Sequence, residues 1–229
     1  MDFCFEIKTI RFEVEYRKVG ALRLTVYPPD GRVVIAAPLG MDREAIEKFA
    51  ASKTGWAEKH RSRFLSHTKL NASLKNHSTV YVWGAPRKLE IIERRGNPKI
   101  VIEGSTMNMF VRPGSTKAKK QELLDKWYHR LLKEAAPEII ENWERRIGVE
   151  VEKLYVRKMK SHWGSCNREK RTLRLNSELA KRDPECLEYV IVHEMVHIFE
   201  KGHNEKFYRL LGKYLPEWKA IRKKLNAGV

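Results

Sequence analysis

The run His-Glu-Met-Val-His at residues 193–197 constrains the fold of this chain more than any other feature. His193 and His197 are four residues apart, so on an α-helix they lie one turn, roughly 5.4 Å, apart on the same face. Two imidazoles at this spacing can bind one metal ion, and Glu194 can then act on a water molecule at that ion. We therefore expect a helix across these residues, with one face turned toward a metal site.

Such a site needs a third ligand, and three residues compete for the role. His203, six residues after His197, is the favoured candidate. Glu217 is an alternative, because gluzincins take a glutamate from a later helix, although an acidic residue at a helix start also has a structural reason to be there. Glu200 lies one turn beyond His197 and would crowd the same face. Gly202 is the first glycine after His197, which predicts that the helix continues further before the chain turns.

Three neutral histidine nitrogens with one open coordination position are typical of a catalytic zinc site rather than a structural one. Zinc held in this way lowers the pKa of bound water to about 7, so that hydroxide is available at neutral pH. Glu194 would then act as the general base and return the proton to a leaving group. The motif predicts a hydrolase with Zn2+ as its cofactor and with His193, His197 and His203 as the ligands.

Composition excludes several other classes of protein. A chain of 229 residues with 42% hydrophobic residues can bury a core, in one domain or two small ones. No run approaches the roughly 18 apolar residues of a membrane helix, and the start of the chain does not resemble a signal peptide. Cys4, Cys166 and Cys186 are too few and too scattered for a disulfide framework. We expect a cytoplasmic protein with no membrane partner, whose oligomeric state the sequence does not indicate.

The net charge of +17 is spread along the chain, which is typical of a solvated surface. A positive field also concentrates anionic ligands, so nucleotide substrates and an association with nucleic acid through the basic surface stay open. One stretch just ahead of the metal helix is locally dense in basic residues: Lys153, Arg157, Lys158, Lys160, Arg168, Lys170, Arg171 and Arg174.

The first 113 residues read as a β-rich section with one long helix. Apolar and polar residues alternate over residues 10–35, which predicts three short antiparallel strands, and again over residues 79–112, which predicts a second group of strands. Between the two groups, Asp42 is a suitable N-cap for a helix that runs to about Ser66. We expect a domain boundary near Gly114-Ser115.

Residues 114–229 read as a second domain, a small sheet among helices, and the predicted fold class of the whole chain is α+β. Its predicted elements are a helix over 117–147 that Pro137 kinks or splits and Gly148 ends, strands at 153–157 and 172–176, the metal helix from Asp183-Pro184, and helices near 204–213 and 216–225.

Three stretches carry a family resemblance: Lys160-Ser161-His162-Trp163-Gly164-Ser165-Cys166, then Leu173-Arg174-Leu175-Asn176, and the metal helix with its continuation Gly202-His203-Asn204-Glu205-Lys206-Phe207-Tyr208. Together they resemble the YgjP-like metal-dependent hydrolases, which are related to the WLM and SprT-like metalloproteases. The resemblance implies a zincin-like core over residues 114–229, with His193, His197 and His203 on zinc and Glu194 as the catalytic base. It also implies that the strand with Trp163 and Cys166 runs beside the metal helix. His162 stands where the family pattern would have an arginine.

The site predicts hydrolysis better than it predicts the substrate. In a metallopeptidase, the strand at 172–176 would pair with an extended peptide, which makes Arg174 and Asn176 candidate substrate-binding residues. Tyr208 would offer its phenol to a developing oxyanion, or would pack the following helix. In a nucleoside triphosphate pyrophosphatase, an activity attributed to family members on UTP, the basic residues from 153 to 174 would hold the triphosphate. A non-catalytic nucleic-acid-binding module is the third interpretation, and the intact Glu194 argues against it.

Overall fold

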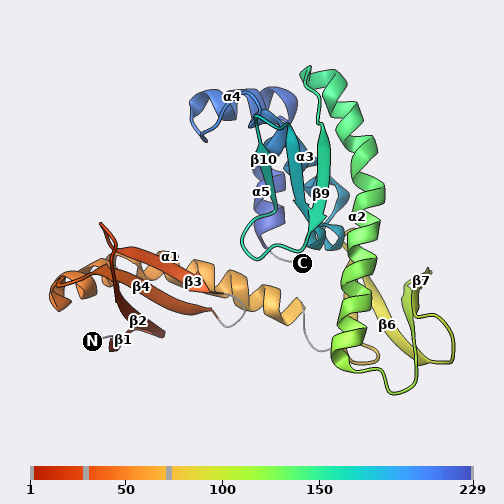
Figure 1. Ribbon diagram of the computed structural model, residues 1–229, viewed down its shortest axis with the longest axis horizontal. Coiled ribbons are helices and arrows are strands. Elements are labelled where there is room, and N and C mark those ends of the chain that lie inside the picture. Colours follow the sequence, from red (N-terminus) through yellow and green to blue (C-terminus); the bar gives the residue numbers. More distant parts are fainter. Residues whose placement is uncertain (1–2, 28–30, 71–73, 228–229) are drawn as a thin grey trace. The chain divides into compact units, whose positions relative to one another are not determined.

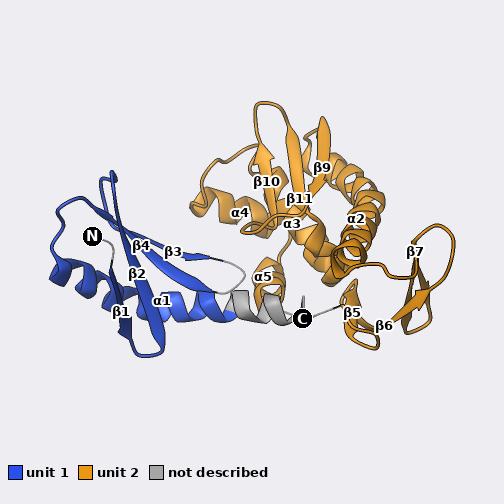
Figure 2. Ribbon diagram, turned by 60° about the horizontal axis from the view of Figure 1, so that its bottom comes forward, with its two compact units in different colours: residues 1–72, 228 blue, residues 73–227, 229 orange. Residues whose placement is uncertain are grey.

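The structure is a computed structural model that describes residues 3–27, 31–70 and 74–227, with the backbone alone for residues 63–70. Its described residues form three small sheets and five α-helices, so the predicted α+β class is confirmed. The chain divides into two compact units, residues 1–72 and residues 73–227 (Figure 2). Each unit has its own hydrophobic core.

The first unit is a four-stranded sheet followed by one long helix. Its elements are β1 (Phe3–Ile7), β2 (Ile10–Arg17), β3 (Arg23–Tyr27), β4 (Arg32–Pro38) and α1 (Arg43–Leu70). The strand order is β1-β2-β4-β3, and β2 runs parallel to β4. The sequence predicted three antiparallel strands. It therefore missed β1, and it was wrong on the direction of β2 relative to β4, because alternation of apolar residues marks a strand but does not identify its partner.

The second unit begins with a sheet of the same topology. It contains β5 (Thr79–Val82), β6 (Ala85–Glu93), β7 (Lys99–Glu103) and β8 (Thr106–Val111), in the order β5-β6-β8-β7, with β6 parallel to β8. A long helix, α2 (Lys117–Ile147), follows it just as α1 follows the first sheet. The chain thus repeats one arrangement of four strands and a helix.

Helix α2 begins and ends where the sequence predicts. The hydroxyl of Thr116 accepts a hydrogen bond from the backbone N–H of Lys119 at 3.3 Å, and Gly148, with φ 79°, closes the helix in the left-handed conformation. Pro137 lies inside the helix without dividing it. The sequence predicted a kink or a split at this proline, and the split was wrong. The buried face of α2 continues through Pro137: Leu124, Tyr128, Leu132, Ala136, Ile140, Trp143 and Ile147.

The remainder of the second unit contains the predicted metal helix. Its elements are β9 (Lys153–Arg157), β10 (Gly164–Asn167), β11 (Thr172–Asn176), the 3-10 helix η1 (Ser177–Lys181), α3 (Pro184–Val196), α4 (Glu205–Tyr214) and α5 (Trp218–Ala227). The sheet has the order β10-β11-β9, so β11 is its central strand.

Helices α2 and α3 pack on the same face of this sheet (Figure 1). The inward residues Val156, Leu173 and Leu175 share one core with Leu132 of α2 and Val190 of α3. Because successive strand residues point to opposite faces, the residues between them, such as Arg174, face away from α3. One face of the sheet therefore carries the metal helix, and the other is free of both helices.

The two compact units divide after residue 72. The domain boundary near residue 114 stays a prediction from the sequence. The second sheet belongs with the metal helix because its β5–β6 turn packs on the segment that leads into α3. The backbone N–H of Trp83 donates to the carbonyl of Ala180 at 2.8 Å. Gly84, with φ 79°, lies so close to Asp183 that a Cβ there would overlap the Asp183 carboxylate. Only glycine fits this contact.

Two further observations concern the class of protein. Within the described part of the chain, no helix combines the length and the apolar character that a membrane span requires. Cys4, Cys166 and Cys186 are all free thiols.

Candidate metal centre

Helix α3 is apolar on nearly all sides, which places it in the interior of the second unit. Seven of its residues are at most 3% exposed: Cys186, Leu187, Val190, Ile191, Val192, Met195 and Val196. A helix that is hydrophobic all round is held by packing on every face, so its polar residues have fixed directions. Asp183 and Pro184 begin the helix as predicted, but Asp183 forms an ion pair with Lys224 at 2.7 Å instead of a side-chain cap.

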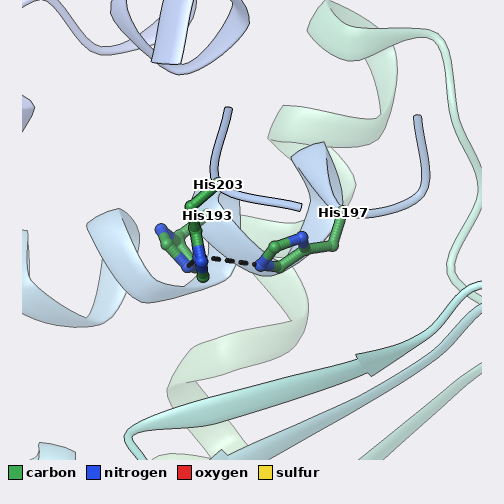
Figure 3. Close-up of side chains that lie close together, drawn as sticks. All are labelled: His193, His197 and His203. Atoms are coloured by element: carbon green, nitrogen blue, oxygen red, sulfur yellow. Dashed lines mark hydrogen bonds between the residues drawn. The ribbon is translucent and has the colours of Figure 1, made fainter. Parts of the chain in front are cut away.

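The three predicted histidine ligands converge on one point (Figure 3). His203 Nε2 lies 2.9 Å from His193 Nε2 and 3.2 Å from His197 Nε2. Metal–nitrogen bonds of about 2.0–2.1 Å in a tetrahedral site hold nitrogen ligands about 3.3 Å apart. The distances of His203 from the other two histidines are therefore close to those that one divalent metal ion requires, and all three ligand atoms lie within 4.8 Å of one another.

His197 is oriented by the turn that follows α3. Its Nδ1 lies 2.9 Å from the backbone carbonyl of Glu200. A carbonyl only accepts hydrogen bonds, so Nδ1 carries the proton and Nε2 keeps its lone pair for a metal ion. The helix ends at Val196, because the N–H groups of Ile198 and Phe199 turn back to the carbonyls of residues 195 and 196 at 3.0 Å. The predicted continuation of the helix toward Gly202 was wrong.

Arg168 holds this turn from the neighbouring sheet. Its guanidinium donates to the carbonyls of Ile198 and Phe199, both at 3.2 Å. Arg168 lies in the turn between β10 and β11, so it connects the sheet to the segment between His197 and His203. Two hydrogen bonds from one planar guanidinium restrain the position of that segment.

His203 is positioned by the start of α4. Asn204 caps this helix by accepting a hydrogen bond from the N–H of Phe207 at 3.0 Å. Phe207 is fully buried, and its ring centroid lies 4.9, 4.6 and 4.7 Å from those of His193, His197 and His203. One aromatic side chain thus packs against all three imidazoles and keeps their rings in place.

The surroundings of the cluster favour neutral imidazoles. Burial, and then the neighbouring His197 and His203, lower the pKa of His193 to about 3. Burial and His197 also lower the pKa of His203. Neutral imidazole is the form that binds a metal ion. His193 Nδ1 is buried and lacks a hydrogen-bond partner among the described residues, a rare condition that is typical of functional sites.

Glu194 is buried beside strand β10. It is 6% exposed, and a Cβ placed on Gly164 would lie 2.7 Å from Glu194 Oε1 and 2.8 Å from its Cγ. The carboxylate can occupy this position only because residue 164 has no side chain. Burial raises the pKa of Glu194 to about 8. No cation or hydrogen-bond donor among the described residues pairs with the carboxylate.

The competing third ligands lie outside the cluster. Glu217 is exposed ahead of α5, and it does not join the three histidines. The carboxylate of Glu200 pairs instead with Lys206 at 3.6 Å, and only its backbone carbonyl contacts the site. Of the three candidates, the structure brings only His203 next to His193 and His197.

Two of the three candidate substrate-binding residues lie away from the metal centre. Arg174 is exposed on the sheet face opposite α3. The amide of Asn176 is buried; it donates to the carbonyls of Met159 and His162, both at 2.9 Å, and accepts from the N–H groups of Met159 and Glu178, both at 3.2 Å. These bonds leave no free polar group on the amide, so Asn176 holds the β9–β10 loop instead of facing a substrate.

Tyr208 does lie at the centre. Its ring stacks on Trp218, with centroids 5.0 Å apart and planes at 16°, and lies 6.2 Å from the ring of His203. The packing that the sequence offered as one alternative is thus present. Because the ring also lies beside His203, the other alternative, in which the phenol of Tyr208 contacts a developing oxyanion, is compatible with the structure.

Sequence reasoning did not assign a role to three residues at the centre, Gly164, Arg168 and Phe207. Gly164 and Phe207 lie within the stretches that carry the family resemblance, but their importance depends on contacts with residues far along the chain. Arg168 belongs to the dense basic stretch, which indicated anion binding instead of a contact with backbone carbonyls.

A family model described as "YgjP-like, metallopeptidase domain" matches residues 22–228. The chain belongs to the YgjP-like metallopeptidase family. This match confirms the resemblance inferred from the motifs, and it identifies the YgjP-like chain as a metal-dependent hydrolase. No curated protein matches the chain.

Two solved structures of metallopeptidase zymogens are similar to part of this YgjP-like protein. Abylysin of Pyrococcus abyssi is 20% identical, with a TM-score of 0.37, over 39% of this chain and 90% of abylysin. Jannalysin of Methanocaldococcus jannaschii is 29% identical, with a TM-score of 0.35, over 38% of this chain and 90% of jannalysin. Both matches leave more than half of the YgjP-like chain uncovered.

Proposed function

We propose that this protein is a zinc-dependent metallopeptidase with a zincin-like core, in which Glu194 is the general base. The observation that carries the proposal is the convergence of three imidazoles: His203 Nε2 lies 2.9 Å from His193 Nε2 and 3.2 Å from His197 Nε2. All three ligand atoms lie within 4.8 Å of one another. Three nitrogen ligands with no carboxylate among them suit zinc, and a tetrahedral ion would keep one position open for water or substrate.

Zinc, when bound, supplies a Lewis acid that polarises a carbonyl and makes water a nucleophile near neutral pH. Glu194 would accept the proton of the attacking water and donate it to the leaving amine. In the metal-free chain, burial raises the pKa of Glu194 to about 8, so this carboxylate accepts a proton more readily than an exposed glutamate. No other group holds the carboxylate among the described residues, which leaves it available to water and substrate.

The proposed route of the peptide differs from the one that the sequence predicted. β11 is paired with β10 on one edge and with β9 on the other, so it has no free edge for a peptide. β10 is an edge strand, and Gly164 within it packs against Glu194. We propose that an extended peptide adds to the free edge of β10, because an edge strand offers unpaired backbone groups.

The pyrophosphatase alternative loses its main support in this proposal. It required the basic residues between 153 and 174 to hold a triphosphate near the metal. Lys153, Arg157 and Arg174 are exposed on the sheet face opposite α3, and Arg168 is bonded to backbone carbonyls. Four of the eight basic residues on which this alternative depended thus face away from α3 or are already bonded, and an assay with UTP tests the alternative directly.

The test offers zinc-loaded protein an unfolded protein and UTP in parallel. The proposal predicts that the unfolded protein is cleaved, that a chelator stops cleavage, and that zinc restores it. Glu194→Gln should keep its zinc and lose turnover. Glu188→Gln is the matched control on the same helix, because glutamine can still accept the hydrogen bond that Trp143 donates to Glu188 at 2.9 Å. Hydrolysis of UTP without proteolysis would overturn the proposal in favour of the alternative.

A further inference from the structure

The sheet face that points away from α3 carries basic residues grouped around an exposed tyrosine. Tyr155 on β9 is 41% exposed, unusual for so large an aromatic side chain in a strand. Lys153 is two residues before Tyr155 and Arg157 is two residues after it, so all three side chains lie on the same face of the strand. Arg174 is its register partner on β11. The ring thus has a basic residue on three sides.

The two arginines lie close to this ring. The guanidinium carbon of Arg157 is 5.9 Å from the ring centroid of Tyr155, and that of Arg174 is 6.0 Å away. Within the part of the chain that the structure describes, Lys153, Arg157 and Arg174 have no carboxylate within 4.0 Å, whereas many of the other surface cations form ion pairs. Their charge is therefore available to an external anion.

The face holds no acidic side chain that would repel such an anion. The residues that alternate onto this face are Lys153, Tyr155, Arg157, Ser165, Asn167, Thr172, Arg174 and Asn176, of which Thr172 and Asn176 are buried. The nearest acidic residues along the chain lie outside the strands: Glu150 and Glu152 precede β9, Glu169 lies in the β10–β11 turn, and Glu178 follows β11. Glu178 is paired with Lys181 at 2.7 Å. Glu150 is already paired with Arg171 at 3.9 Å.

We propose that this face, defined by Lys153, Tyr155, Arg157 and Arg174, binds single-stranded nucleic acid. Tyr155 stacks on one unpaired base, and the three cations contact phosphates on both sides of it. An exposed aromatic ring among cations matches this ligand, because single strands offer both a base face and a regular row of negative charges. A duplex keeps its bases stacked internally, so it would use the cations but not the ring. Because the face points away from Glu194, binding requires no metal ion and is independent of the proposed peptidase function.

The test measures binding of a fluorescently labelled 12-nucleotide oligo(U) to metal-free protein by anisotropy, over a range of salt concentrations. Oligo(dT) of the same length and a 12-base-pair duplex are the comparison ligands. We expect single strands to bind more tightly than the duplex. Tyr155→Ala should weaken binding of the single strand at least fivefold, and Tyr155→Phe should bind as the unmodified protein does.

Charge is tested with a matched pair of double variants. Arg157→Ala with Arg174→Ala should reduce the slope of log K against log salt by about 1.4, because each phosphate contact on a single strand contributes about 0.7. Arg130→Ala with Arg145→Ala removes the same charge from exposed positions on α2, where each arginine is paired with a glutamate. This control should leave the slope unchanged.

Three results would overturn the proposal: equal weakening in both double variants, an unchanged affinity in Tyr155→Ala, or a duplex that binds as tightly as the single strand. All the substituted side chains are exposed, so the variants should melt at the same temperature as the unmodified protein. Cleavage of an unfolded protein by Tyr155→Ala should also be unchanged, which separates failure of this proposal from failure of the proposed function.

Discussion

Glu194 packs over Gly164 so closely that a single added carbon would lie 2.7 Å from its Oε1 and 2.8 Å from its Cγ. The two residues come from different elements, α3 and the edge strand β10, and their contact fixes the distance between the proposed base and the proposed substrate strand. Val190, one helical turn before Glu194, would lie 2.9 Å from the same carbon. The helix and the strand therefore approach each other as closely as a glycine allows.

Gly164→Ala should lower kcat for peptide cleavage at least tenfold, because the methyl group must displace the Glu194 carboxylate and a misplacement of about 1 Å can cost about a hundredfold in rate. Zinc affinity should not change, since the three atoms nearest to the added carbon belong to Glu194 and Val190 and none belongs to a histidine. Gly202→Ala is the control, because a Cβ at residue 202 meets no atom within 4 Å. An alanine variant at 164 with unchanged kcat would show that Glu194 does not need this position.

Arg168→Ala should weaken zinc binding by about tenfold to a hundredfold, the usual effect of removing a group that orients a metal ligand. Its two hydrogen bonds, to the carbonyls of Ile198 and Phe199, hold the turn on which His197 is oriented. Competition with a chromophoric chelator measures the affinity. Lys170→Ala removes the same charge two residues away and should bind zinc as the unmodified protein does. Equal losses in both variants would mean that charge, and not the turn, is responsible.

The buried carboxylate of Glu194 should make the metal-free protein less stable as the pH rises. Its pKa is about 8 in the folded chain and near 4.5 in an exposed reference state, so between these values the folded state binds more protons than the unfolded state. The free energy of unfolding therefore falls as the pH rises from about 4.5 to 8. Glu194→Gln lacks this effect and should be more stable than the unmodified protein above pH 8, by up to roughly 5 kcal/mol.

This difference is measured by urea denaturation of both chelated proteins from pH 4.5 to 8.5. His193, whose pKa burial lowers to about 3, contributes stability that is lost as the pH falls below 6.5, but it does so equally in both proteins. The difference between them reports Glu194 alone. A difference that stays constant with pH would contradict the raised pKa.

The metal helix was the part of the fold that sequence predicted best. Asp183 and Pro184 mark its start by local chemistry, and a long apolar run keeps it in the interior. The proximity of His193 and His197 followed from their spacing, because residues four apart on a helix share a face. His203 was the favoured one of three candidates for the third ligand. Local signals of this kind do not depend on the rest of the chain.

The pairing of strands could not be predicted in the same way. Alternation marked residues 172–176 as a strand but gave no information on which strands flank it. Gly164–Asn167 has no apolar alternation, so only the family resemblance implied a strand there. If β10 were not a strand, β11 would have a free edge. The contacts of Gly84 with Asp183, and of Arg168 with residues 198 and 199, likewise join segments far apart in sequence.

His203 should complete a three-histidine zinc site, and a zinc titration of three metal-free proteins measures this. The unmodified protein should bind one zinc ion, His203→Ala should bind it at least a hundredfold more weakly, and Glu217→Ala should bind it with unchanged affinity. Unchanged affinity in His203→Ala, together with a large loss in Glu217→Ala, would mean that Glu217 and not His203 is the third ligand.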